Sequence, residues 1–108
     1  MSVAYHLYYK GENGSARRFA EEMEISGLAD AIRGEDGNLR YEYSLLLNDP
    51  ETLLLVDVWR DASALAAHHG SPLMAKLAQL REKYDLHMTA ERWVSSEADP
   101  AEEKFIRK

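Results

Sequence analysis

Four segments of the chain have the hydrophobic patterning of β-strands, either alternating with polar residues or running continuously apolar. They are residues 3–9, 38–47, 52–59 and 86–94. Between the first two, apolar residues recur at helical spacing over residues 15–33, with a break at Ser26-Gly27. This pattern predicts a kinked or two-part helix that ends at Gly34. Residues 48–51 predict a hairpin connection between the second and third strands.

Two helices are expected between the third and fourth strands. Asp61 can cap a short helix that turns His68 toward the sheet. Ser71 can then cap a longer helix over residues 72–84, with proline at the first helical position. Because the third strand closes on Trp59, we expect the imidazole of His68 to lie above that indole.

The order strand, helix, strand, strand, helix, strand predicts an α+β ferredoxin-like domain, βαββαβ, with a four-stranded antiparallel sheet and helices on one face. We assign this domain to residues 1–95 and treat residues 96–108 as a charged C-terminal tail that packs on a partner subunit or frays. The face without helices is expected to carry apolar residues from all four strands. An exposed apolar surface of that size predicts a partner, and we expect a homodimer.

Composition narrows the classes of function. The 108 residues carry a formal net charge of −6 and no basic stripe, which argues against nucleic acid or an anionic membrane as a partner. There is no cysteine, so disulfides, thiolate catalysis and cysteine zinc sites are excluded. The first residues do not resemble a signal peptide and no apolar run reaches the length of a membrane span, so we expect a soluble, cytoplasmic protein.

His68 is the leading candidate for a catalytic residue. An imidazole that faces the sheet can take or give a proton near neutral pH, although a buried histidine held by a backbone carbonyl fits the same pattern. Asp57 and Trp59 share one face of the third strand. Asp57 is the second catalytic candidate, able to orient a histidine or a bound hydroxyl. Trp59 offers a flat wall to an aromatic substrate, and both residues also suit purely structural roles.

Three further residues are candidates for substrate binding. His6 is expected to point into the same cleft and Tyr41 to line it with a hydroxyl. Ser71 lies beside the histidines, although it already serves as a helix cap. His6, His68 and Asp57 would approximate a two-histidine, one-carboxylate metal site, but no helical ligand spacing supports one. Glycine fingerprints for nucleotides are missing as well, so we expect neither a metal nor a cofactor.

Two stretches of the chain carry motifs that can be compared with known families. One is the strand ending in Trp59-x-Asp61 followed by Ala64-Leu65-x-x-His68-His69-x-Ser71-Pro72, and the other is Gly37-Asn38-Leu39-Arg40-Tyr41-Glu42-Tyr43. Together they resemble the antibiotic biosynthesis monooxygenase family of the dimeric α/β-barrel superfamily, and the likeness spans about positions 3 to 95. The resemblance implies that two sheets meet face to face and close a barrel between subunits.

For function, the resemblance implies a cofactor-independent monooxygenase that uses dioxygen on quinols or polycyclic phenols, whose electron-rich ring anion reacts without metal or flavin. Haem-degrading relatives carry an axial histidine in the helix after Ser71 and a tryptophan at the position of His68, so haem breakdown is disfavoured here. Two alternatives stay open because the fold hosts unrelated chemistries. One is a small-molecule binding domain without turnover, and the other is an isomerase of a small hydroxylated metabolite with His68 as acid and base.

Overall fold

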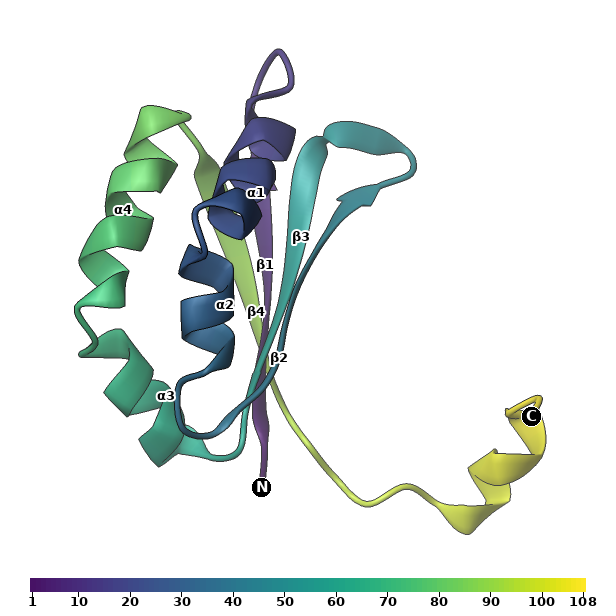
Figure 1. Ribbon diagram of the computed structural model, residues 1–108. Helices are drawn as coiled ribbons and strands as arrows, with labels where there is room; N and C mark the ends of the chain where they lie inside the picture. Colours follow the sequence, from purple (N-terminus) through teal and green to yellow (C-terminus); the bar gives the residue numbers. More distant parts are fainter.

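The computed structural model describes residues 1–108 and contains one antiparallel sheet in the order β2-β3-β1-β4. The strands are β1 (Val3–Lys10), β2 (Asn38–Leu46), β3 (Asp49–Trp59) and β4 (His87–Val94). The helices are α1 (Ser15–Ile25), α2 (Leu28–Arg33), α3 (Ala62–His69) and α4 (Leu73–Lys83), followed by a 3₁₀ helix, η1 (Pro100–Phe105). All four α-helices lie on one side of the sheet (Figure 1). This is the ferredoxin-like α+β fold that the sequence predicts.

Local chemistry accounts for where the elements begin and end. Gly27 adopts φ 82°, a left-handed conformation that suits glycine and separates α1 from α2 as predicted. The hairpin between β2 and β3 is tighter than predicted, because β3 begins at Asp49 rather than at Thr52. The carboxylate of Asp49 accepts hydrogen bonds from the Thr52 hydroxyl and the Glu51 backbone N–H, and a register shift beside Leu46 absorbs the extra residues.

The hydrophobic core lies between the sheet and the helices. Its largest fully buried side chains are Trp59, Tyr9, Tyr41, Phe19, Met23, Ile32, Leu53, Leu55 and Leu77. The ring of Phe19 on α1 packs 5.4 Å from that of Tyr9 and 5.9 Å from that of Tyr43, measured between centroids. These contacts hold α1 over the centre of the sheet.

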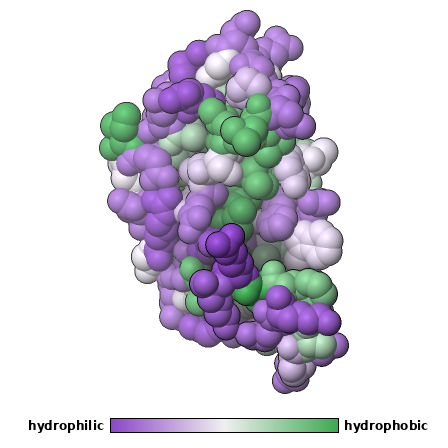
Figure 2. Space-filling model, turned by 90° about the vertical axis from the view of Figure 1, so that its right-hand side faces the viewer, coloured by the Kyte–Doolittle hydropathy of each residue, from purple (hydrophilic) through white to green (hydrophobic).

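No element covers the opposite face of the sheet. Figure 2 views this face and shows a hydrophobic band between hydrophilic margins. The band consists of partly exposed residues from the two central strands, namely Ala4, Tyr8, Leu54, Val56 and Val58. The exposed Trp93 of β4 lies beside it. It is narrower than predicted, because the strand register turns Tyr43 of β2 and Ala90 of β4 toward the helices, level with Leu7.

After β4 the chain runs away from the body of the domain (Figure 1). The backbone N–H of Ser95 donates to the carbonyl of Ser2 at 3.1 Å, beyond which η1 leaves Phe105 and Ile106 exposed. None of the helices has both the length and the apolar character that crossing a membrane requires.

Candidate functional site

A cavity of about 240 Å³ lies between the sheet and the helices α3 and α4. Its apolar lining comes from Leu7, Leu55, Met74, Leu77, Met88 and Ala90. Its polar lining comes from Tyr5, Tyr41, Asp57, His68, His69 and Arg81. The cavity therefore combines an apolar body with a few convergent polar groups, which is the composition of a small-molecule site.

His68 reaches the cavity from the last turn of α3. Asp61 caps that helix, because its Oδ1 accepts the backbone N–H of Ala64 at 2.8 Å. The cap holds the helix directly after Trp59, the last residue of β3, and the two rings stack with centroids 4.5 Å apart and planes 25° apart. The side chain of His68 is only 3% exposed. The imidazole is thus fixed between the indole and the cavity.

Glu35, in the loop after α2, is the hydrogen-bond partner of His68. Its Oε1 lies 2.7 Å from His68 Nδ1. A carboxylate accepts only, so the bond places a proton on Nδ1, and in the neutral form of the ring Nε2 is then the acceptor. Nε2 makes no hydrogen bond within the chain, and no side-chain nitrogen or oxygen is both fully buried and unpaired. Nε2 therefore remains accessible from the cavity.

The close packing of the loop 34–37 against α3 brings Glu35 to His68. Gly37 adopts φ 85°, and a Cβ built on it would lie 2.4 Å from the Cβ of Ala64. Its carbonyl accepts the backbone N–H of Arg60 at 2.7 Å, which ties the loop to the end of β3. Sequence reasoning missed Glu35, because its contact with His68 spans 33 residues and involves no regular element. The glycine is the only local signal of the close approach.

Asp57 lies on the floor of the cavity, 5% exposed. Its Oδ1 accepts the indole Nε1–H of Trp59 at 2.7 Å. Burial raises the pKa of the Asp57 carboxyl to about 6, against the opposing influence of the nearby His68. The histidine-orienting role considered for Asp57 belongs to Glu35 in this structure, and Asp57 holds the indole on which the histidine rests.

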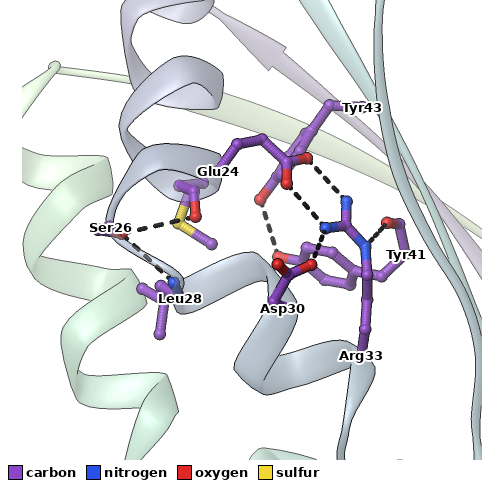
Figure 3. A network of polar contacts seen from close by, with 8 residues as sticks. Glu24, Ser26, Leu28, Asp30, Arg33, Tyr41 and Tyr43 are labelled. Carbon is purple, nitrogen blue, oxygen red and sulfur yellow. Dashed lines mark hydrogen bonds and ion pairs between the residues drawn. The ribbon is translucent and has the colours of Figure 1, made fainter.

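Tyr41 is anchored from both ends. Its hydroxyl lies 2.8 Å from that of Tyr43, and its carbonyl accepts Arg33 Nε–H at 2.8 Å (Figure 3). Arg33 also pairs with Glu24 and Asp30, so this network joins α1, α2 and β2. Burial raises the pKa of Tyr41 well above its usual value, which keeps the phenol neutral. Tyr41 thus presents a fixed, uncharged ring to the cavity.

Arg81, on α4, is the one arginine or lysine that lines the cavity. Its Nε and Nη2 both donate to the hydroxyl of Tyr9, at 3.1 and 2.8 Å. Its guanidinium carbon also lies 5.4 Å from the centroid of the same ring. Arg81 could not be singled out from the sequence, because an arginine off the apolar stripe of a predicted amphipathic helix is expected to face solvent.

The prediction that His6 points into this cleft is wrong. His6 pairs with Val56 and Glu91 on the face without helices, and its ring lies 6.3 Å from that of Trp93. The strict alternation of β1 sends Tyr5 and Leu7 to the cavity and His6 to the other side. The triad of His6, His68 and Asp57 therefore does not assemble, and no other group of three such side chains is close enough to hold a metal.

The other two candidates for substrate binding are also outside the cavity lining. Trp59 has no exposed surface and supports the imidazole of His68 from beneath. The Oγ of Ser71 accepts the backbone N–H of Leu73 at 3.1 Å, which is the capping role expected from the sequence. The polar residues that do line the cavity are Tyr5, Tyr41, Asp57, His68, His69 and Arg81, and Glu35 acts on it only through His68.

The family model for antibiotic biosynthesis monooxygenase matches residues 2–80, and the chain belongs to that family. Its fold is similar to that of SnoaB, a cofactor-independent oxygenase from Streptomyces nogalater, with 13% identity and a TM-score of 0.74 over 92% of this chain and 97% of that one. Rv0793 from Mycobacterium tuberculosis has 19% identity and a TM-score of 0.74, over 91% of this chain and 98% of that one.

A conserved protein from Methanosarcina mazei has 16% identity and a TM-score of 0.76, over 89% of this chain and 94% of that one. At these identities the structural likeness establishes the fold, and function has to be argued from the site. A comparison with curated proteins finds no match.

Proposed function

We propose that this protein is a cofactor-independent monooxygenase that uses dioxygen to oxygenate a quinol or phenol, with His68 as the base. The observation that carries the proposal is the hydrogen bond between Glu35 and His68 at the wall of an apolar cavity. The family supports the reaction class, and SnoaB, which has the same fold, is a cofactor-independent oxygenase.

In the proposed reaction, Nε2 of His68 removes a proton from the substrate, and the Glu35 carboxylate stabilises the imidazolium that forms. The resulting ring anion is electron-rich and forms a carbon–oxygen bond with dioxygen. Proton return gives a hydroperoxide, and loss of water leaves a carbonyl. One oxygen atom thus enters the product and the other leaves as water. Asp57 would bind a second hydroxyl, and Tyr41 would contact the ring face.

The lining of the cavity favours this reading over an isomerase of a small hydroxylated metabolite. With Tyr5 and Tyr41 counted for their rings, eight of the twelve lining residues are hydrophobic, which suits an aromatic ring and leaves few partners for several hydroxyls. A homodimer is also part of the proposal. The hydrophobic band with its neighbour Trp93, which is 54% exposed, would be buried if two sheets met face to face.

Oxygen consumption against a panel of one- to three-ring quinols, with and without chelator, tests the reaction. The proposal requires chelator-resistant oxygen uptake in stoichiometry with product, and its loss in His68→Ala. Binding of quinols without any oxygen uptake would instead identify a binding domain.

A further inference from the structure

We propose that the aromatic substrate of this cavity carries an anionic substituent, such as a carboxylate, which Arg81 binds. The inference rests on the proposed function for the ring hydroxyl that His68 deprotonates. It adds a second point of recognition at the opposite end of the cavity.

The cavity of about 240 Å³ suits a small aromatic ligand, because sites for drug-sized ligands occupy roughly 300–1,000 Å³. A larger groove of about 540 Å³ lies between α2 and α4, but neither the Glu35–His68 pair nor Asp57 lines it.

The anionic group follows from the charge of Arg81. Four other arginines each pair with a carboxylate of this chain: Arg17, Arg33, Arg40 and Arg60. Arg81 is partly buried at the cavity and its hydrogen bonds go to the Tyr9 hydroxyl, which burial keeps neutral by raising its pKa. No carboxylate of the chain contacts Arg81, although Asp57 interacts with its charge across the cavity. A partly desolvated guanidinium in this position attracts an anion, and its planar set of donors matches a carboxylate.

The positions of the two polar groups define the orientation of the substrate. Arg81 sits over Tyr9 at one end of β1, while His68 stacks on Trp59, which pairs with Val3 at the other end. Tyr5 and Leu7 form the floor between them. A ring on this floor would offer its hydroxyl to Nε2 of His68 and its anionic substituent to the guanidinium of Arg81.

Anaerobic calorimetry with matched ligands tests the inference without requiring turnover. The probes are 1,4-dihydroxy-2-naphthoate and its neutral analogue 1,4-dihydroxynaphthalene. We expect wild-type protein to bind the carboxylate about 10- to 100-fold more tightly than the neutral naphthalene, as a charge-assisted bond allows.

Variants on α4 assign the preference to Arg81. Arg81→Met should abolish the preference for the carboxylate and leave the affinity for the neutral naphthalene nearly unchanged, and Arg81→Lys should keep part of it. Lys76→Met, which removes a charge from the other side of α4, should behave as wild type. Equal binding of the two naphthalenes by wild type, or an unchanged preference in both Arg81 variants, would refute the anion site.

The same titrations keep this inference separate from the proposed function. Tight, Arg81-dependent binding without oxygen uptake would refute the monooxygenase and leave the ligand class standing. Oxygen uptake on neutral quinols alone, unaffected by Arg81→Met, would refute the ligand class and leave the monooxygenase standing.

Discussion

The two faces of the sheet follow the same alternation of residues but differ in the burial and hydrogen bonding of their polar groups. On the helix-covered face, Asp57, His68 and Arg81 are buried or partly buried, and each hydrogen-bonds to another side chain. On the open face, His6 has only a tilted aromatic neighbour, and apolar residues occupy the centre. Burial with specific partners marks the face that can do chemistry, and exposed apolar surface marks the face that can assemble.

The two histidines give the largest expected difference between the faces. His68→Ala should lower kcat for a quinol by about 10²- to 10⁴-fold, because it removes the base. His6→Ala, on the open face, should leave kcat within about 2-fold of wild type. Oxygen-electrode rates at saturating substrate measure both. Comparable losses in the two variants would remove the functional distinction between the faces.

Charge introduced on the open face tests assembly. Val56→Asp places a carboxylate on a central strand, where a face-to-face dimer on the order of 2,000 Å² would bury it without a partner. Light scattering at micromolar concentration should report a dimer for wild type and a monomer for this variant. Ala78→Asp adds the same charge to the exposed side of α4 and should remain dimeric. A wild-type monomer would contradict the assembly.

Titration of Asp57 tests the burial of charge beneath the cavity. Its pKa is raised to about 6, so the native state holds this proton more tightly than the unfolded chain does. The contribution of Asp57 to the free energy of unfolding is therefore complete at low pH and is lost as the pH rises through 6. Asp57→Asn removes the titration and keeps an acceptor for Trp59. Its stability relative to wild type should therefore rise by about 2 kcal/mol between pH 4.5 and 7.5 in urea unfolding.

Asp36 provides the control for that titration. It is exposed, and its hydrogen bond with Arg60 lowers its pKa, so Asp36→Asn should not gain stability as pH rises. A flat difference between Asp57→Asn and wild type across this range would mean that the carboxyl is not desolvated.

A smaller effect concerns the glycine that brings Glu35 to His68. Gly37 and Gly27 both have positive φ, but a Cβ meets Ala64 at the first position and nothing within 4 Å at the second. Gly37→Ala should therefore destabilise the fold by about 1 kcal/mol more than Gly27→Ala, measured by chemical denaturation. It should also lower turnover, while Gly27→Ala should not.

Much of the fold and part of the site could be predicted because the underlying signals are local. Alternation and helical spacing locate the elements, and the short link from Trp59 to the Asp61 cap brings His68 over the indole. Glu35 and Arg81 could not be predicted in the same way. Glu35 depends on a loop approach across the fold, and the position of Arg81 depends on how α4 packs over β1.

The pairing of Glu35 with His68 is the central claim, and a double-mutant cycle of oxygen-uptake rates tests it directly. His68→Gln keeps hydrogen-bonding capacity but cannot act as a base, and should lose about 10²-fold or more in kcat. Glu35→Gln should lose roughly 10-fold, because the imidazolium loses its carboxylate. If the two act as one unit, the double variant should be no slower than His68→Gln alone. A folded His68→Gln protein with the wild-type rate would contradict the account.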